Sequence, residues 1–142
     1  AIVFYLASEL KMKNKDIEDL LNKKSGLLGL TNMRDLRDII SAAGYKVSGF
    51  KASHKYSPLD RKRAKLAISI FVYNVARFLA SYIGMSKKLD AIVFTGGIGQ
   101  NSAIIRKMIL KKIQKPKNCK VLVIEEAEMI NIANKTIKCL SK

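Results

Sequence analysis

The chain has 142 residues, of which 49% are hydrophobic, so it is long enough for one domain with a core of its own. No apolar run approaches the ~18 residues that span a bilayer, and the opening residues lack the charged region and cleavage site of a signal peptide, so we expect a cytoplasmic protein. The net charge is +16, but the basic residues recur at helical spacing without interleaved aromatic residues, which favours solvated helix faces over a nucleic-acid surface.

The first two predicted helices differ in how their apolar residues are distributed. Ile2 to Lys11 is apolar nearly all round, which indicates a mostly buried helix. Asn14 is the predicted N-cap of a second helix, in which Lys23 and Lys24 complement the dipole at the C-terminal end and Gly26 is the terminator. The apolar face of this second helix contains Ile17, Leu20 and Leu21.

A loop over 27–31 separates these helices from a third. Asn32 is its predicted N-cap, with Asp35 three residues later as in a capping box, and Gly44 ends it. The positions expected to face inward are Met33, Leu36, Ile39, Ile40 and Ala43.

Residues 44–60 show no clear period and are predicted to form a loop. Ser57 then begins the longest helix, with Pro58 at the first helical position and Asp60 as the carboxylate of a capping signature. Gly84 ends this helix. Its predicted inward positions are Ala64, Ala67, Ile68, Phe71, Val75, Phe78, Leu79 and Tyr82.

Two short strands are predicted in the second half, Ala91 to Phe94 and Lys120 to Ile124. The helix between them is capped by Asn101 or Ser102 and ended by Pro116. A strand, a helix and a strand in this order predict a right-handed unit with a parallel pair. The inward positions are Ile105, Met108, Ile109 and Ile113 in that helix, and Ile132, Ala133, Ile137 and Leu140 in a last helix over 128–140.

A turn with three glycines lies directly after the first strand. Gly96, Gly97 and Gly99 have no Cβ and can adopt positive φ, so a ligand can approach the backbone closely. The exposed N–H groups and the positive dipole end of the following helix favour an anion in the same space, usually a phosphate. A strand–glycine–helix junction is also found as a tight connection without any ligand, and the turn is neither a Rossmann nor a Walker fingerprint.

Longer strings resolve this ambiguity. Three segments closely resemble the acetate kinase family in their order and in their residues: LLNKKSGLLGLTNMRDLRDI at 20–39, AKLAISIFVYNVARFLASYIG at 64–84 and LDAIVFTGGIGQNS at 89–102. The resemblance covers nearly the whole chain but only the C-terminal part of such an enzyme. It differs in an insertion within 44–60 and a shortened stretch between Lys111 and Lys120.

The resemblance implies an α/β fold that is helix-rich with a short parallel strand pair. It would be part of a ribonuclease-H-like domain, as in the actin, hexokinase and Hsp70 ATPase superfamily, where nucleotide binds between two domains. Residues 1–142 would be the C-terminal part of the second domain, with the N-terminal domain absent. The implied reaction interconverts ATP and acetate with ADP and acetyl phosphate, and this chain would form only the nucleotide-binding side.

Two segments match the nucleotide site of the family. Asn32 stands where the family has Asp, so a negative charge is lost, and Gln100 likewise replaces Glu. A plain helix cap for Asn32 and a solvated charge for Arg34 are the structural alternatives. The resemblance implies nucleotide binding by Asn32, Met33, Arg34, Gly97, Ile98, Gly99, Gln100 and Asn101.

Glu128 aligns with the carboxylate that the family associates with Mg²⁺, a hard cation that prefers oxygen ligands. Glu125 and Glu126 are alternatives if the alignment shifts, and a first-turn carboxylate that stabilises its own helix is the structural alternative. We expect no function for His54. The remaining candidates, Cys119 and Cys139, are expected to be free thiols.

Phosphoryl transfer needs cationic groups around the moving phosphoryl group and a site for the acceptor. In the family these groups precede the matched region, so no catalytic residue is assigned here. A butyrate or propionate kinase, an inactive remnant of a split or decaying gene and, less favoured, a basic nucleic-acid-binding protein are the alternatives. The implied partners are nucleotide, Mg²⁺, a short-chain carboxylate, a separately encoded N-terminal half and a second copy in a homodimer.

Overall fold

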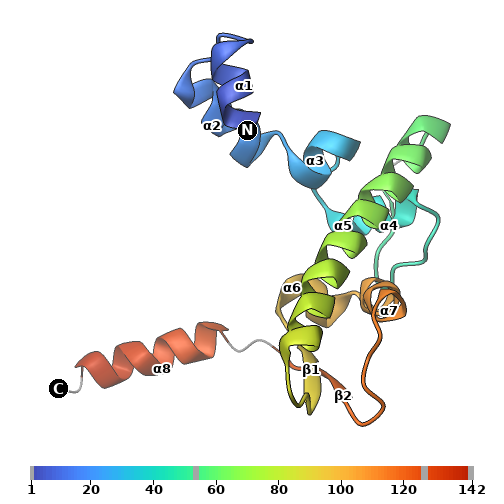
Figure 1. The fold of residues 1–142 in the computed structure, drawn as a ribbon, viewed down its shortest axis with the longest axis vertical. Helices are drawn as coiled ribbons and strands as arrows, with labels where there is room; N and C mark the ends of the chain where they lie inside the picture. The colour runs from blue at the N-terminus through green and yellow to red at the C-terminus, as the bar shows by residue number, and fades with distance from the viewer. Residues whose placement is uncertain (1, 53–54, 126–127, 141–142) are drawn as a thin grey trace. The chain divides into compact units, whose positions relative to one another are not determined.

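The computed structural model describes residues 2–52, 55–125 and 128–140, and the side chains of 128–130 lie outside this description. The chain divides into two compact units, Ala1–Phe71 and Val72–Lys142. The long helix α5, Pro58–Met85, passes through the boundary between them (Figure 1). We describe each unit by itself.

The first unit contains four short helices before α5. The predicted helices are confirmed as elements, and one further helix, α3, forms at the position of the predicted loop 27–31. Gly26 enters α3 with a φ of +62°, and a Cβ on Gly29 would lie 2.7 Å from the carbonyl oxygen of Lys24, so these glycines allow α3 to follow α2 closely. The four helices are α1 (Ile2–Ser8), α2 (Asn14–Lys23), α3 (Gly26–Thr31) and α4 (Leu36–Ala42).

Two predicted N-caps are wrong. Asn14 is the first residue of α2, and Lys13 is its N-cap without a side-chain hydrogen bond. Asn32 ends α3 instead of starting α4: its φ is +58°, and its N–H donates to the Leu28 carbonyl at 2.8 Å. Asn tolerates the left-handed region, so it terminates a helix as readily as it begins one. Asp35 is the N-cap of α4 and accepts a hydrogen bond from the Arg37 N–H at 2.8 Å.

The helix ends differ from the predictions in two further places. α2 ends at Lys23 with Lys24 as its cap, so Gly26 belongs to the next helix. α7 ends at Lys112, before Pro116. Gly44 does follow the end of α4, with a φ of +94°.

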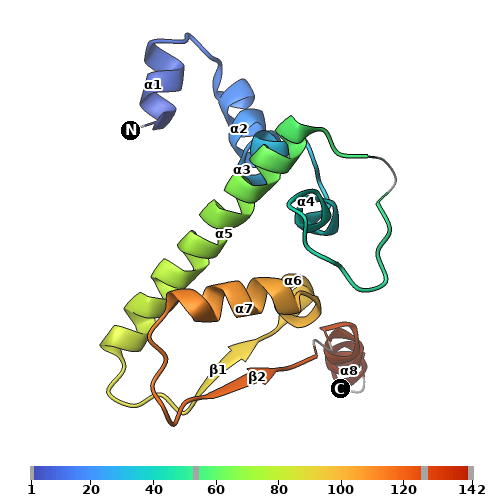
Figure 2. The same ribbon diagram turned by 90° about the vertical axis from the view of Figure 1, so that its right-hand side faces the viewer.

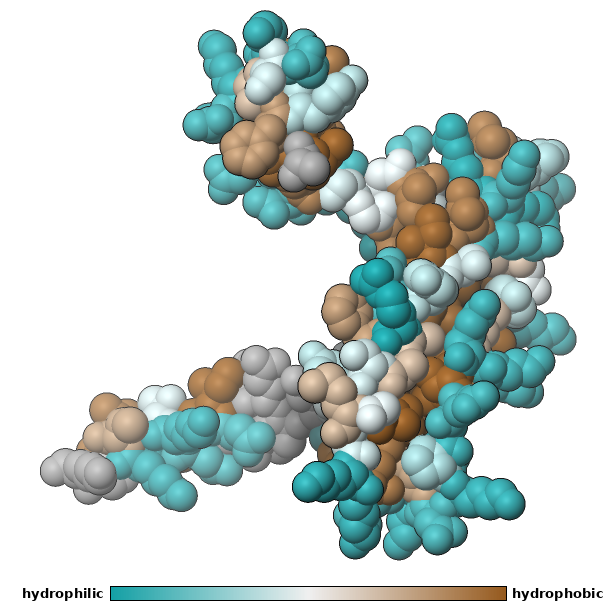
Figure 3. Space-filling model, viewed as in Figure 1, coloured by the Kyte–Doolittle hydropathy of each residue, from teal (hydrophilic) through white to brown (hydrophobic). Residues whose placement is uncertain are grey.

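The core of the first unit lies between α4 and the first part of α5. Ile39, Ile40 and Ala43 are buried, as predicted for this helix, and Ala64, Ala67 and Ile68 are buried on α5. The prediction for α1 is wrong, because only Leu6 is buried there and Phe4 is 76% exposed. An apolar sequence makes burial favourable, but among the described residues α1 packs mainly against α2, and Ile2, Val3, Phe4 and Tyr5 stay exposed. Figure 3 shows apolar surface, in brown, on the part of the chain that contains these two helices.

The capping signature before α5 is confirmed. The Ser57 N–H donates to Oδ2 of Asp60 at 3.0 Å, and the Asp60 N–H donates to the Ser57 Oγ at 3.1 Å. The loop before it is attached to α4, because the Tyr56 hydroxyl donates to Asp38 at 2.9 Å. Burial and this hydrogen bond together raise the pKa of Tyr56.

α5 is long and apolar enough, by length and composition only, to cross a membrane. The expectation that no segment reaches that limit is therefore wrong, since few charged residues interrupt the second half of this helix. The finding is weak evidence for a membrane, because the core helix of a soluble protein meets the same criterion.

The buried positions of α5 also differ from the prediction beyond residue 71. Phe78 and Tyr82 are exposed, the latter to 67%, whereas Val72 and Ala76 are buried. The buried positions continue at four-residue steps from Ile68 and do not follow the seven-residue repeat through Phe78. The sequence pattern is compatible with burial of either set of apolar residues, and the tertiary packing determines which set is buried.

The second unit is built around two parallel strands, β1 (Ala91–Phe94) and β2 (Lys120–Val123). Ala91 pairs with Lys120 and Phe94 with Val123, which confirms the predicted parallel pair. Figure 2 shows α6 and α7 along one side of the pair. The helices of this unit, besides the end of α5, are α6 (Gly96–Asn101), α7 (Ala103–Lys112) and α8 (Glu128–Leu140).

Ile92, Ile105, Ile109 and Cys119 form the buried positions around the strands. The burial of Ile105 and Ile109 agrees with the prediction for α7, whereas the other two predicted positions, Met108 and Ile113, are half-buried. The inward positions predicted for α8 are wrong in the described residues, because Ile132, Ile137 and Leu140 are exposed there. The pattern indicates that these residues share one face, whereas burial also requires a surface that covers it.

Candidate functional site

The predicted glycine turn is itself a short helix, α6, which begins directly after β1. Only Gly96 has a positive φ, +69°, whereas Gly97 and Gly99 have helical conformations. Thr95 precedes α6 in an extended conformation, and its side chain forms no capping hydrogen bond. Since the first N–H groups of an α-helix have no partner inside the helix, the amide end of α6 is open at the C-terminal end of β1.

The carbonyl end of α6 is closed by the chain itself. The Asn101 side-chain amide donates to the Gly97 carbonyl at 3.0 Å, and the Ser102 N–H donates to the Ile98 carbonyl at 3.0 Å. Ser102 is also the N-cap of α7, where its Oγ accepts from the Ile105 N–H at 3.4 Å. Of the two predicted caps, Ser102 therefore begins α7, while Asn101 ends α6.

Arg106 completes this closure from α7. One guanidinium nitrogen, Nη1, donates to the Gly99 carbonyl at 2.8 Å and to the Gln100 carbonyl at 2.7 Å. The sequence analysis did not identify Arg106, although an arginine one turn into the next helix is a residue type that binds terminal carbonyls. The result is a helix whose carbonyls from Gly97 to Gln100 accept hydrogen bonds and whose first N–H groups are not capped by the Thr95 side chain.

The two helical glycines of α6 have different surroundings. A Cβ on Gly97 would meet nothing within 4 Å, so this side of α6 is open to an approaching molecule. A Cβ on Gly99 would lie 3.4 Å from the carbonyl carbon of Phe94, so Gly99 lets α6 pack against the end of β1. Ile98 is partly exposed on the same helix.

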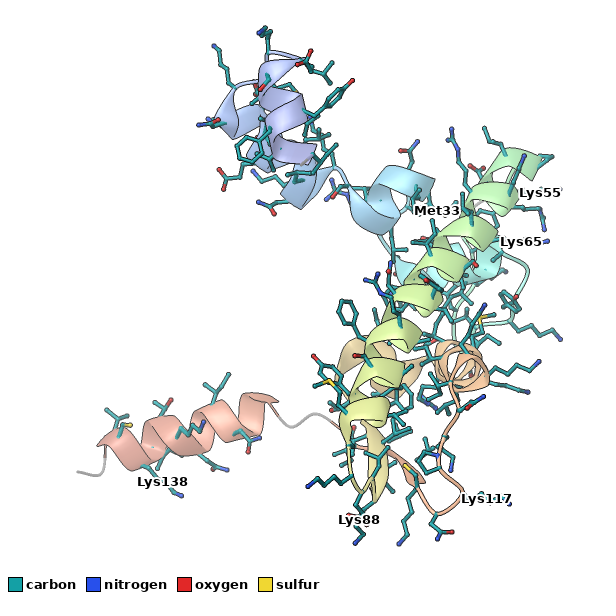
Figure 4. All side chains as sticks on the ribbon, viewed as in Figure 1. Met33, Lys55, Lys65, Lys88, Lys117 and Lys138 are labelled. Atoms are coloured by element: carbon teal, nitrogen blue, oxygen red, sulfur yellow. The ribbon has the colours of Figure 1, made fainter. Side chains whose placement is uncertain are left out.

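The other predicted segment, Asn32 to Arg34, lies between α3 and α4, where Figure 4 labels Met33. Its conformation depends on Thr31, whose buried hydroxyl donates to the Leu27 carbonyl at 2.7 Å and accepts from the Met33 N–H at 3.1 Å. Thr31 is the functional candidate that sequence reasoning missed here. A hydroxyl residue before a left-handed Asn was the available signal.

The charges beside this segment are divided between paired and unpaired groups. Arg37 donates to both carboxylate oxygens of Asp35, at 2.6 to 3.1 Å, and these hydrogen bonds lower the pKa of Asp35. Arg37 also lies over the Phe50 ring, 5.2 Å from its centroid. Within the described residues, Arg34 is exposed and forms no ion pair, so its guanidinium is available to an anionic ligand.

The predicted metal site falls largely outside the described side chains. Glu128 begins α8, but its side chain is not described, and neither is any part of Glu126 or His54. Glu125 is exposed. The described residues contain no group of three or more His, Cys, Asp or Glu that could hold a metal. Cys119 and Cys139 are free thiols, the former buried, as predicted.

Comparison with known proteins gives one consistent family. The family model described as "Acetokinase family" matches residues 1–136 of this chain. Acetate kinase of Acetivibrio thermocellus is 35% identical over 97% of this chain and 37% of its own length. Acetate kinase of Francisella tularensis subsp. holarctica is 41% identical over 78% of this chain and 25% of its own length.

Solved structures agree with this fold. A propionate kinase from Francisella tularensis has a TM-score of 0.74 and 35% identity over 93% of this chain and 36% of its own. Porphyromonas gingivalis acetate kinase has a TM-score of 0.73 at 24% identity over 98% of this chain and 37% of its own, which bears on the fold alone. The fold class, part of an α/β domain of the acetate and propionate kinase type, is confirmed. The chain spans between 25% and 37% of the length of these relatives, and it belongs to the acetokinase family.

Proposed function

We propose that this chain forms the nucleotide-binding side of an acetokinase-type phosphotransferase, which interconverts ATP and acetate with ADP and acetyl phosphate. The observation that carries the proposal is α6, in a chain of this family, with its amide end open after β1 and its carbonyl end closed. Open amides and a positive dipole end favour a phosphate group over a neutral one.

In this proposal the backbone from Gly97 to Asn101 binds the nucleotide, and Gly97 leaves the space that the ligand needs. Ile98 borders the site, and the neutral Gln100 adds no repulsion to a phosphate. In the first unit, Arg34 is proposed as a charged, planar donor for nucleotide binding, with Asn32 and Met33 as its backbone neighbours. Asn32 through Arg34 and α6 belong to different units, and each is assigned to nucleotide binding from the family resemblance.

Mg²⁺ would accompany the nucleotide. It often retains several waters and takes few protein ligands besides phosphate oxygens. One carboxylate is proposed to come from Glu128, with Glu125 and Glu126 as the alternatives. When bound, the ion would neutralise phosphate charge, and the protein's part would be to orient the nucleotide.

The acceptor and the cationic groups for transfer are proposed to come from a further part of the enzyme, the N-terminal domain and the leading part of the second domain, either separately encoded or joined to these residues. The likeness to a propionate kinase leaves propionate, and by extension butyrate, as alternative acceptors. A homodimer of the family type and a cytoplasmic location belong to the same proposal. An inactive remnant remains the competing interpretation, and it is distinguished by nucleotide binding.

Isothermal titration calorimetry with ADP and Mg²⁺ tests the nucleotide site. Gly97→Val places a branched side chain in the open space, and we expect the affinity to fall by at least about tenfold, or ~1.4 kcal/mol. Gly84→Val is the matched control, because Gly84 is also a helical glycine with nothing within 4 Å. Equal ADP affinity in both variants, or no binding by the unsubstituted chain, would reject the proposed site.

Acetyl-phosphate formation tests the division of labour. We expect no turnover by residues 1–142 alone and turnover when the missing part of a relative is added in trans. Turnover by the chain alone would contradict the assignment of no catalytic residue. Of the lysines labelled in Figure 4, Lys65 lies on α5, whereas Lys88 and Lys117 lie in the connections that precede β1 and β2, and Lys88 forms an ion pair with Asp90 at 3.2 Å. DNA binding with a steep inverse salt dependence would support the less favoured alternative of a basic nucleic-acid-binding protein.

A further inference from the structure

Arg106 lies on α7 and is not among the residues assigned to nucleotide binding. Its side chain nevertheless donates hydrogen bonds to α6, the helix that is proposed to bind the nucleotide. We infer that Arg106 is a positioning residue: it fixes the carbonyl end of α6 and thereby the direction of the open amides at the other end. The identity of the ligand rests on the proposed function, whereas the geometry rests on hydrogen bonds within the second unit.

The helix α6 is weak by itself. It has six residues, three of them glycines, whereas isolated helices shorter than ~12 residues are marginal in water. Each interior glycine disfavours a helix by ~1 kcal/mol relative to alanine. Local propensity therefore does not explain why the segment is helical, and contacts from outside must hold it.

Arg106 makes the charged contact among those that hold α6. Its Nη1 donates to the Gly99 and Gln100 carbonyls, and hydrogen bonds from a charged donor are stronger than neutral ones. Its positive charge also lies at the end of α6 where the helix dipole is negative. Arg106 is half-buried, and its neighbour Ile105 is fully buried, so α7 holds the guanidinium in place.

The consequence concerns the amides, which lie only about one helical turn from these carbonyls. If the carbonyl end loosens, α6 unwinds and the amides of Gly97 and Ile98 no longer point in one direction. A nucleotide would then have to order the loop on binding, and its affinity would fall by that cost. Arg106 thus acts on the ligand through α6.

Three variants separate this role from a loss of charge or of fold. Arg106→Met removes both hydrogen bonds, and Arg106→Lys retains the charge and a donor. Lys107→Met is the matched control, because Lys107 is the exposed neighbour on the same helix and loses the same charge. Amide hydrogen exchange of the ligand-free chain reports the order of α6 at Gln100 and Asn101, and calorimetry reports ADP affinity at a temperature where every variant is folded.

We expect Arg106→Met to speed exchange in α6 and to weaken ADP binding, each by at least about tenfold, with partial recovery in Arg106→Lys and no change in Lys107→Met. Unchanged exchange in α6 of Arg106→Met would overturn the inference. So would faster exchange with full ADP affinity. If the unsubstituted chain does not bind ADP, the proposed function fails, and the exchange data alone still decide whether Arg106 holds α6.

Discussion

The hydroxyl of Thr31 offers the most direct test of how the Asn32–Arg34 segment is held. Thr31 is only 2% exposed, and its Oγ1 forms three short-range hydrogen bonds: it donates to the Leu27 carbonyl at 2.7 Å and to the Met33 carbonyl at 3.4 Å, and it accepts from the Met33 N–H at 3.1 Å. Thr31→Val keeps the shape of the side chain and removes the hydroxyl. The Met33 N–H then loses its acceptor, which costs about 1–3 kcal/mol when the group is buried.

Met33 is half-buried, so water can partly replace the lost acceptor and we expect the lower half of that range, about 1–2 kcal/mol. Urea denaturation followed by circular dichroism measures the change, and faster exchange of the Met33 amide locates it. Thr31→Ser keeps the hydroxyl and should retain slow exchange at Met33. Thr136→Val is the control, because the Thr136 hydroxyl donates to the Ile132 carbonyl at 3.0 Å on an exposed helix.

The reasoning would be refuted if Thr31→Val were as stable as the unsubstituted chain and exchanged its Met33 amide at the same rate. Equal destabilisation by Thr31→Val and Thr136→Val would also refute it, because the argument depends on burial of the first hydroxyl. If Arg34 contributes to nucleotide binding, Thr31→Val should in addition weaken ADP binding.

Two further predictions concern the same unit. Gly29→Ala should destabilise the chain by about 1–3 kcal/mol in urea denaturation, because its Cβ would lie 2.7 Å from the backbone oxygen of Lys24. Gly84→Ala is the control and should be tolerated, because a Cβ there meets nothing within 4 Å. Equal stability of the two variants would contradict this prediction. The second prediction concerns Asp35, whose pKa in the folded state is lowered because Arg37 donates hydrogen bonds to its carboxylate. The pair therefore stabilises the fold above pH ~4. This contribution is lost as the pH falls through the lowered pKa. Because the Arg37 side chain is 61% exposed and that of Asp35 36%, solvent screens the pair and the effect is small. Asp35→Asn should lower the melting temperature slightly at pH 7 and not at pH 2, and a larger effect at pH 2 would show the sign to be wrong.

The features that were predictable from the sequence depend on neighbouring residues. Ser57 and Asp60 are three residues apart and form reciprocal hydrogen bonds, so the start of α5 can be predicted from four consecutive residues. The apolar strands on either side of a helix likewise predicted the parallel pair. The family itself followed from contiguous strings, because the residues that carry the resemblance stand in order along the chain.

The features that were not predictable depend on partners distant in sequence or on a choice between equal local options. Asn32 is a residue type that can begin or end a helix; in the structure it ends α3, and Asp35 is the N-cap of α4. The three glycines of α6 suggested a turn, yet the segment is helical. Its carbonyls find donors up to seven residues away, and no propensity scale includes such bonds.

By itself, the sequence determined the two strands, most of the helices in their order and the family, but not α3, α6 or the glycine of the turn that has a positive φ. Only the tertiary structure decided which apolar faces are covered, as at Val72 and Ala76 rather than Phe78, and which end of α6 is closed. The physical reason is that periodicity and capping act between neighbours along the chain. Burial and the satisfaction of carbonyls, in contrast, depend on which surfaces and donors the fold brings into contact.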